Sequence, residues 1–512
     1  MKRILSLCCA VLLLAGCADP FPDTYIPTGD GLTWDDGQGG TAQTPEVDDQ
    51  VLTLTYNPDK GFNPIGCIDF TNRALFSLIY QSLFVYDRDY NVEPLLCHRY
   101  SRSADMKTYV FYLEENATFS DGTKVTAEDV VASFRTASIN QMYSGRFQQI
   151  ASYSVTADGG VQVKTKVAME NLPLLLDIPI IPQSQQTEVR PIGSGPYVLD
   201  ETTGTLRLRR RSDWWCQADL LVTAPSVSLV KSQNITQVRD LFQFGDLSLA
   251  LSDPGSDKYH ADFRNDYELW DMENGIFVYL ACNMESGLFT NATLRSALTY
   301  AIDRDMLAQD YYRGFARSAT LPASPLSPYY NKGLAQKYGY DAIKFAEAVE
   351  ATGKQGTEVV LLLNRDDSLR LRVGKAIAQM LEDCGLKVKV EEKSTTEYLK
   401  ALRNRSYDLY LGQTRLTATM DLSAFFSASG SLNYGALGDV ALYSLCQQAL
   451  ANYGNYYTLH KAVMDDGRLC PIVFRSYAVY AKRGELTGLS PARDNVFRYS
   501  LGKTMEQALI TN

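Results

Sequence analysis

The chain has 512 residues, which is too long for one hydrophobic core and favours two or three domains. A hydrophobic content of 45% and a charged content of 21% are ordinary for a globular protein, so the chain can fold without metal ions or dense disulfides. The net charge is −10, and the stretch from Ala18 to Gln50 is acidic without any Lys or Arg. The chain has no dense basic patch of the kind that binds a phosphate backbone, so nucleic acid is excluded as a partner.

The N-terminus is typical of an exported lipoprotein. Lys2 and Arg3 precede an apolar run too short to span a membrane, and Leu14-Ala15-Gly16-Cys17 resembles the lipobox of bacterial lipoproteins. We expect residues 1–17 to be a signal peptide ending at a lipidated Cys17, which anchors the protein to the extracytoplasmic face of the cell membrane. Residues 18–47 then form an acidic, flexible linker. The alternatives are an ordinary signal peptide or a buried hydrophobic N-terminal helix.

The cysteines that follow Cys17 are seven in number and widely spaced. An odd number cannot all pair, and the spacing fits neither a CxxC zinc knuckle nor a dense disulfide scaffold. Isolated cysteines in apolar company are usually core residues. We therefore predict mostly buried thiols at Cys67, Cys97, Cys216, Cys282, Cys384, Cys446 and Cys470.

After the linker, strand and helix patterns follow one another. Residues 51–56 are predicted to be a strand, and apolar residues at helical spacing predict a helix over 73–84. Residues 109–113 are predicted to be a strand, and Ser120-Asp121-Gly122 a turn. Thr126 is predicted to cap a helix, whose early acidic residues suit the helix dipole.

The later half of the chain has the order strand, helix, strand. Residues 359–363 are predicted to be a buried strand, and 386–390 alternate as the returning strand. Between them lies a helix that Gly385 ends. Residues 407–411 are predicted to be a further strand of the same sheet. The apolar face of the helix consists of Leu369, Val373, Ile377 and Leu381. The architecture is therefore expected to be α/β with several lobes.

Several blocks of the sequence, in order, resemble the bacterial extracellular solute-binding proteins of family 5, the oligopeptide, dipeptide and nickel-binding class. The most specific block is Phe119-Ser120-Asp121-Gly122 with residues 126–134, which is similar to the family's FHDGxxxTAEDVxxSF signature. Such residues are first of all turns, caps and core faces, so they identify the scaffold and not the ligand pocket. The other blocks are residues 107–111, 193–197, 209–215 and 294–304.

The resemblance implies a two-lobed periplasmic-binding-protein-like fold of type II in its three-domain form, with a cleft between the lobes and a hinge that closes on ligand. It implies a domain II at residues 75–177 and a domain III, the second lobe, at 269–477. The discontinuous domain I comprises residues 48–74, 178–268 and 478–512.

The same resemblance implies the substrate-binding component of an ABC importer. Such a protein captures a peptide or similar small solute and delivers it to permease subunits. We expect a monomer that has no enzymatic activity, needs no cofactor and holds no metal.

Ligand-binding residues are expected, by position in the family pattern, on both sides of the cleft. From one lobe these are Ile68, Asp69, Phe70 and Thr71 after the first strand, with Tyr143 in a side pocket. From the other lobe they are Gly412, Gln413, Thr414 and Arg415, at the end of the predicted strand 407–411.

The sequence departs from its relatives at this last stretch. Peptide-binding members often carry a GWxxD-like stretch whose Asp pairs with the free amino terminus of the peptide, but here Gln413 replaces the Trp and Leu416 or Thr417 replaces the Asp. The missing carboxylate weakens the case for a peptide amine, unless Asp69 or Asp421 compensates. Arg415 would favour a ligand carboxylate if it faces the cleft, and is otherwise a solvent-facing strand end.

Other functions remain open at this point. The chain has no HExxH, GxSxG or GxxxxGK[ST] motif, and its three histidines, His98, His260 and His460, are far apart. Both features argue against a surface hydrolase, and the scarcity of His argues against a histidine-held metal. A receptor that senses a peptide signal, or one that binds an oligosaccharide, would use the same closing cleft, so the sequence does not separate these functions from import.

Overall fold

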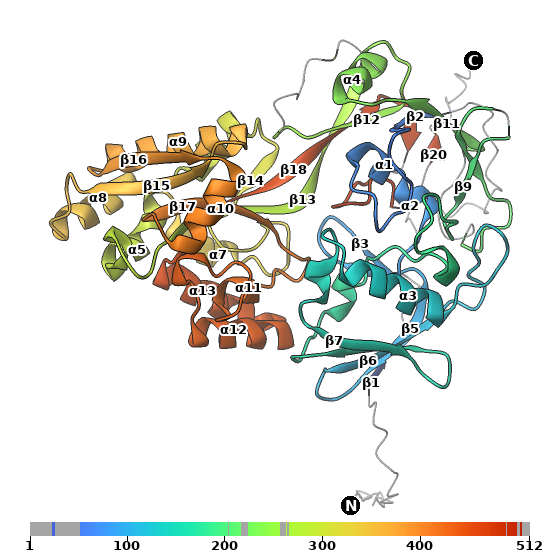
Figure 1. Ribbon diagram of the computed structural model, residues 1–512, viewed down its shortest axis with the longest axis horizontal. Helices are drawn as coiled ribbons and strands as arrows, with labels where there is room; N and C mark the ends of the chain where they lie inside the picture. Colours follow the sequence, from blue (N-terminus) through green and yellow to red (C-terminus); the bar gives the residue numbers. More distant parts are fainter. Residues whose placement is uncertain are drawn as a thin grey trace, which may run out of the picture.

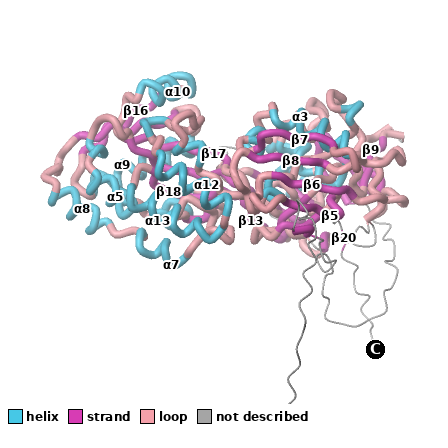
Figure 2. Tube along the Cα trace, turned by 90° about the horizontal axis from the view of Figure 1, so that it is seen from below, coloured by secondary structure: helices cyan, strands magenta, loops and turns pink. Residues whose placement is uncertain are grey.

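The computed structural model describes residues 52–202, 204–216, 224–255, 263, 266–487 and 489–498, together with the short strands β1 (Asp23–Tyr25) and β20 (Gly502–Lys503). The expected signal peptide, with Cys17, and nearly all of the expected linker lie outside the described residues. The described chain forms two lobes joined by the long strands β13 (Tyr267–Cys282) and β18 (Leu469–Lys482), as Figures 1 and 2 show from two directions. Within these residues, no helix combines the length and apolar character needed to cross a membrane.

The first lobe contains a four-stranded sheet in the order β2-β11-β10-β9. The predicted first strand is confirmed as β2 (Leu52–Tyr56), and its inward residues Leu52 and Leu54 are buried. β2 pairs in parallel with β11 and the other pairs are antiparallel. The remaining elements are β9 (Tyr197–Asp200), β10 (Arg207–Arg210), β11 (Ser226–Lys231) and α4 (Ile235–Gln243).

The helix predicted over residues 73–84 is wrong in its bounds. Two short helices, α1 (Phe70–Ala74) and α2 (Phe76–Ile79), meet at Leu75, and Tyr80 is already extended with φ −121° and ψ 137°. The chain then enters β3 (Phe84–Tyr86), which pairs with β4 (Val92–Pro94). Every residue from 74 to 86 is buried, so tertiary packing on all sides overrides the helical spacing.

A second sheet of the first lobe has the order β1-β5-β6-β8-β7, and α3 (Ala127–Ser138) packs beside it (Figure 1). The predicted cap of α3 is confirmed, because Thr126 and Asp129 form a reciprocal capping box. The predicted turn is confirmed by Gly122, whose φ of +86° suits only a residue without a side chain. The strands are β5 (Cys97–Arg102), β6 (Thr108–Leu113), β7 (Ile150–Val155) and β8 (Val161–Thr165), and the single-turn helices are η1 (Ser144–Phe147), η2 (Leu172–Leu175) and η3 (Gln183–Gln185).

The third large sheet runs from the first lobe into the second, in the order β12-β18-β13-β17-β15-β16, with β14 (Ala316–Ser318) beside β18. The predicted strand-helix-strand unit is confirmed as β15 (Glu358–Asn364), α9 (Ser368–Asp383) and the parallel β16 (Lys387–Lys393). Its helical face is buried, and Gly385 has a φ of +95°. The other strands are β12 (Leu249–Ser252) and β17 (Leu409–Arg415), the latter confirming the strand predicted at 407–411 with a shift of two residues at its start.

Helices cover this sheet in the second lobe (Figure 1). They are α5 (Ala292–Ala297), α6 (Arg304–Met306), α7 (Lys332–Ala335), α8 (Ala342–Ala351), α10 (Thr395–Asn404), α11 (Ser423–Phe426), α12 (Val440–Ala451) and α13 (Tyr456–Asp466). Short single turns occur at Leu288–Thr290, Leu298–Ala301, Leu307–Tyr311, Gln336–Tyr338, Tyr434–Ala436 and Tyr453–Asn455.

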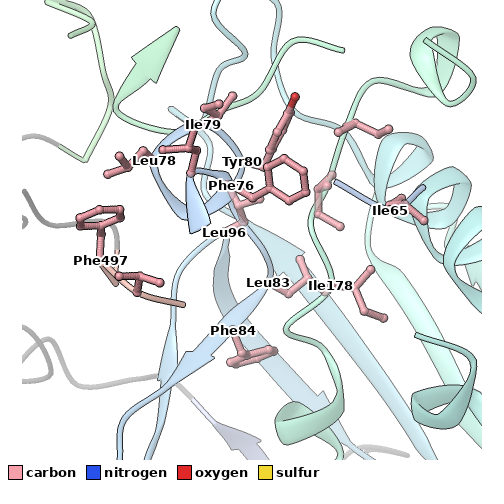
Figure 3. Packing of buried hydrophobic residues seen from close by; sticks show 14 of the residues in the cluster. Ile65, Phe76, Leu78, Ile79, Tyr80, Leu83, Phe84, Leu96, Ile178 and Phe497 are labelled. Atoms are coloured by element: carbon pink, nitrogen blue, oxygen red, sulfur yellow. The ribbon is translucent and has the colours of Figure 1, made fainter. Parts of the chain in front are cut away.

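The core of the first lobe also holds a segment near the C-terminus. Residues 489–498, here called the C-terminal segment, follow β18 and the short strand β19 (Leu486–Thr487). Phe497 of this segment belongs to the same buried cluster as Phe76, Ile79 and Leu83 (Figure 3). Arg498 pairs with Glu93 at 2.5 Å, so both an apolar anchor and an ion pair hold the segment.

The prediction for the cysteines is confirmed. All seven that follow Cys17 are buried free thiols. Burial raises the pKa of the Cys67, Cys97 and Cys282 thiols, which keeps them protonated and unreactive.

Candidate functional site

A cavity opens where the C-terminal segment meets the first lobe. The cavity itself is small, about 60 Å³, and with the open space at its mouth the hollow amounts to about 570 Å³. We call it the arginine cavity and define it by the five charged residues that line it and by Tyr143, one of three lining tyrosines. These six residues are Arg73, Tyr143, Arg146, Asp177, Arg493 and Asp494. The lining comes from α1, η1 and its preceding turn, the loop after η2 and the C-terminal segment, so the fold of the whole first lobe positions it.

Asp494 is the electrostatic centre of this site. Its Oδ1 accepts a hydrogen bond from Arg415 Nη2 at 2.6 Å, and its Oδ2 lies 4.0 Å from Arg73 Nη2 and 3.9 Å from Arg146 Nη2. Burial alone would raise the pKa of the Asp494 carboxyl, but the surrounding guanidinium groups of Arg415, Arg73 and Arg146, together with Arg493, outweigh it and hold that pKa well below its usual range. Asp494 is therefore a permanent carboxylate held among four arginines.

Arg146 is fixed by a second carboxylate. Its Nε and Nη2 donate to Asp177 Oδ1 and Oδ2 at 2.6 and 2.7 Å, a bidentate pair. The guanidinium also lies 4.9 Å from the ring centroid of Tyr143, and that of Arg73 lies 5.7 Å from the same centroid. Both cations therefore lie within cation–π range of Tyr143, whose hydroxyl donates to the Pro64 carbonyl at 3.2 Å.

Arg415 reaches the cavity from the second lobe. It is the last residue of β17, opposite Ile276 of β13, and its Nε donates to the Asn274 carbonyl at 2.9 Å. The irregular pairing of β13 with β18 after Glu273 places this carbonyl beside the strand end. Arg415 is therefore an ion-paired residue at the junction of the lobes and not a free strand end.

The predicted site residues thus fall into separate places. Tyr143 lines the arginine cavity and Arg415 contacts it through Asp494, so the structure brings these two together. Phe70 and Thr71 line a different, smaller cavity with Val238 and Phe497. The Phe70 ring also packs 4.6 Å, centroid to centroid, from Tyr477 of β18.

Ile68 and Asp69 lie at the edge of this arrangement. The Ile68 side chain is 74% exposed, and Asp69 caps α1 by accepting from the Asn72 amide at 3.0 Å. Asp421, the other acid considered as a partner for a peptide amine, accepts from Gln149 Nε2 at 2.9 Å and so links the two lobes. Roles for these residues in ligand binding stay predictions.

The rest of the predicted strand end makes contacts within the second lobe and to β18. Gly412 lies against Tyr279, where an added Cβ would come within 2.5 Å of the ring. Gln413 accepts from Arg475 Nη1 and donates to Asp367, both at 3.4 Å. Thr414 pairs with Phe277 in the sheet. These contacts account for the local packing, and ligand contacts by the three residues stay predictions.

Five of the six residues that define the arginine cavity were not among the predicted site residues: Arg73, Arg146, Asp177, Arg493 and Asp494. The sequence signal was weak, because Arg73, Arg146 and Asp177 are isolated charges with no periodic pattern. Arg493 and Asp494 are adjacent opposite charges in the short stretch between Pro491 and Phe497, which is typical of a turn. Among the described residues, no three His, Cys, Asp or Glu side chains gather as a metal-binding group.

The comparisons with known proteins agree with this architecture. Residues 91–435 match the family model described as bacterial extracellular solute-binding proteins, family 5 Middle. The unliganded open form of MppA, a periplasmic murein tripeptide binding protein, has a TM-score of 0.74 at 16% identity, covering 89% of this chain and 98% of that one. The oligopeptide-binding protein AppA from Bacillus subtilis, in complex with a nonapeptide, has a TM-score of 0.63 at 19% identity, covering 90% and 100%.

Sequence relatives give the same class. The glutathione-binding protein GsiB of Salmonella typhi is 25% identical over 346 residues, and that of Escherichia coli O1:K1 / APEC is 25% identical over 352 residues. In both cases the match covers 64% of this chain and 66% of the relative, so the chain spans just under two thirds of the length of these proteins.

The two-lobed α/β fold, with its sheet strands crossing between the lobes, is that of the periplasmic binding proteins. Since the family model covers more than half of its length, the chain belongs to the bacterial extracellular solute-binding proteins of family 5. The family resemblance seen in the sequence is thereby confirmed.

Proposed function

We propose that this protein captures a peptide or similar small solute between its lobes and delivers it to the permease subunits of an ABC importer. Membership of family 5 and the glutathione- and peptide-binding relatives support a solute of this size. We further propose that Cys17 carries the lipid that anchors the monomeric protein at the extracytoplasmic face of the membrane. Neither role requires a chemical step on the solute.

The observation that carries the proposal is the contact between the lobes beside the arginine cavity. Tyr143 and Asp494 of the first lobe line this cavity, and Arg415 of the second lobe pairs with Asp494 from outside the lining. The lobes also touch through Gln149 and Asp421. A ligand that contacts residues of both lobes stabilises the closed arrangement over an open one, which is the differential affinity that hinge closure requires.

The division into domain I (48–74, 178–268 and 478–512), domain II (75–177) and domain III (269–477) is part of the same proposal. It is supported by the sheets, because β2, β9, β10 and β11 come from the first group of residues and β5 to β8 from the second. The crossings of β13 and β18 are then the hinge.

The test is a thermal-shift screen of the full chain against tripeptides, glutathione, oligosaccharides and a nickel–histidine complex. A ligand at a hundred times its Kd stabilises the native state by about 2.7 kcal/mol, enough for a clear shift. Shifts with tripeptides or glutathione, without any change in the recovered solute, support the proposal. Shifts with oligosaccharides alone, or hydrolysis of the solute, contradict it. Delivery is tested by stimulation of the ATPase activity of the permease complex in proteoliposomes.

A further inference from the structure

The arginine cavity has more positive charge than its own carboxylates neutralise. Three arginines and two aspartates line it. Asp177 is taken up by the bidentate pair with Arg146, and Asp494 is paired through its Oδ1 at 2.6 Å with Arg415 from outside the lining. The Oδ2 of Asp494 accepts no hydrogen bond from the described residues. Arg73 and Arg493 therefore face the cavity without a close carboxylate of their own, Arg73 being 4.0 Å from Asp494.

Arg493 lines this cavity and also a smaller one beside Glu273, and it has unused hydrogen-bond donors. Its residue is 7% exposed and its Nη2 donates to the Leu416 carbonyl, but its Nε and Nη1 have no hydrogen-bond partner among the described residues. Ser77 Oγ, also buried in the cavity wall, has none either. Buried donors are nearly always paired in native proteins, because an unpaired one costs the free energy of its lost hydration. These donors indicate a place where a ligand supplies the acceptor.

Glu273, which interacts electrostatically with Arg493, does not fill that place. Its Oε1 accepts from the Tyr90 hydroxyl at 2.5 Å and its Oε2 from Ser324 Oγ at 2.6 Å. Burial raises the pKa of the Glu273 carboxyl, whereas the pKa of Asp494 is lowered. Of these two acids near Arg493, Glu273 is therefore the one that is more easily protonated.

The backbone at Arg493 is held in a left-handed conformation. Its φ is +48°, which a residue with a Cβ adopts only at a cost, and seven other described non-glycine residues also have a positive φ. Such strain is retained where the surroundings fix the residue. Here the C-terminal segment is fixed at and after the turn, by the Asp494–Arg415 pair and by Phe497 in the core.

The remaining wall of the cavity is part apolar and part polar. Phe76, Val85 and Pro179 line it beside the arginines. Ser77, Ser82 and Asn495 add polar groups, and the Tyr80 hydroxyl is already used, donating to the Phe62 carbonyl at 2.7 Å. A suitable ligand therefore has an anionic end for Arg73 and Arg493 and an apolar body for this wall.

We propose that the arginine cavity binds the anionic end of the solute, with Arg493 Nε and Nη1 donating to it and Arg73 supplying a second positive charge. A carboxylate and a phosphate group share this chemistry, since both accept paired hydrogen bonds from a guanidinium. The inference rests on the proposed function, because it names the chemical class of the solute captured there.

The test is isothermal titration of the full chain with pairs of probes that differ only in charge. The pairs are trialanine with trialaninamide and glutathione with its dimethyl ester; inorganic phosphate and neutral maltotriose are separate probes. We expect the carboxylate form of each pair to bind about tenfold or more tightly than its neutral partner, the ratio for losing a charge-assisted hydrogen bond. If inorganic phosphate binds and neither carboxylate probe binds, the natural solute is assigned a phosphate group in place of a carboxylate. The proposed anion site then stands.

Variants separate the site from general stability. Arg493→Gln and, independently, Arg73→Gln are expected to lower affinity for the anionic probe about tenfold or more, while Arg209→Gln, which changes an exposed arginine of β10, leaves it unchanged. Circular dichroism and melting curves identify the variant that stays folded. Equal binding of charged and neutral partners, or unchanged affinity in a folded Arg493→Gln or Arg73→Gln variant, overturns this inference alone. Absence of binding by every probe overturns the proposed function with it.

Discussion

Replacing His460 with leucine is expected to make the second lobe less sensitive to mild acid. His460 lies in α13, its residue is 0% exposed, and its ring centroid is 5.6 Å from that of Tyr456. Neither ring nitrogen has a hydrogen-bond partner among the described residues. A charged imidazolium here would be removed from bulk water without a described acceptor, so the folded protein keeps the ring neutral.

The size of the effect follows from the pKa of this ring. Burial lowers the pKa of His460 from 6.5 to about 3. Below pH 6.5 the unfolded chain therefore binds a proton that the folded chain does not, so the stabilising contribution is complete above pH 6.5 and is lost as the pH falls. At about 1.36 kcal/mol per pH unit, the loss between pH 6.5 and pH 5 is about 2 kcal/mol.

Two measurements check this. The first is the free energy of unfolding in urea at pH 7 and at pH 5, followed through the amide protection of α13. Between these two pH values, the parent should lose about 2 kcal/mol more of this free energy than His460→Leu does. The second is an NMR titration of the histidine rings. The chain has only three histidines, so the imidazole resonance that is missing from the His460→Leu spectrum identifies His460. The reasoning is refuted if the His460 resonance titrates with a midpoint near pH 6, or if the variant loses as much stability as the parent.

Three further changes have expected outcomes. Arg304→Met removes the donors that lie 2.8 and 3.0 Å from the carbonyls of Pro471 and Thr299. Chemical denaturation should show a loss of stability of about 3 kcal/mol, and a loss below about 1 kcal/mol contradicts this prediction. Gly412→Ala places a methyl group against Tyr279 and should lower the free energy of unfolding by about 1–3 kcal/mol. A second change, Tyr279→Leu, should restore part of this loss. An unchanged melting temperature in Gly412→Ala argues against this packing role. Cys17→Ser should abolish the mass increment of the acyl chains and release the protein from the membrane fraction, whereas a variant that stays acylated excludes Cys17 as the lipid site.

The features of the fold that the sequence predicted are those with a local cause. The Thr126 and Asp129 box depends on two side chains three residues apart, and the face of α9 on a spacing within one helix. The helix expected over 73–84 failed for the opposite reason. Its residues are buried on every side, so the apolar spacing carried no information about which face was inside, and the break at Leu75 comes from packing against distant parts of the lobe.

The same distinction explains what was found of the site. Tyr143 and Arg415 were expected because they lie at recognisable positions in the family pattern. Asp494, which joins them, was not, since it meets Arg415 across 79 residues of sequence and comes from a turn with no periodic pattern. Its burial is stable only because Arg73, Arg146 and Arg415 arrive from separate elements, and no one of those elements requires a partner acid at 494. A turn that places two opposite charges, Arg493 and Asp494, inside an apolar stretch is favourable only if the rest of the fold supplies their counter-charges. For Asp494 the fold supplies them, whereas two donors of Arg493 have no acceptor among the residues that the structure describes. The turn that completes the lobe junction therefore also provides the donors to which we assign the solute.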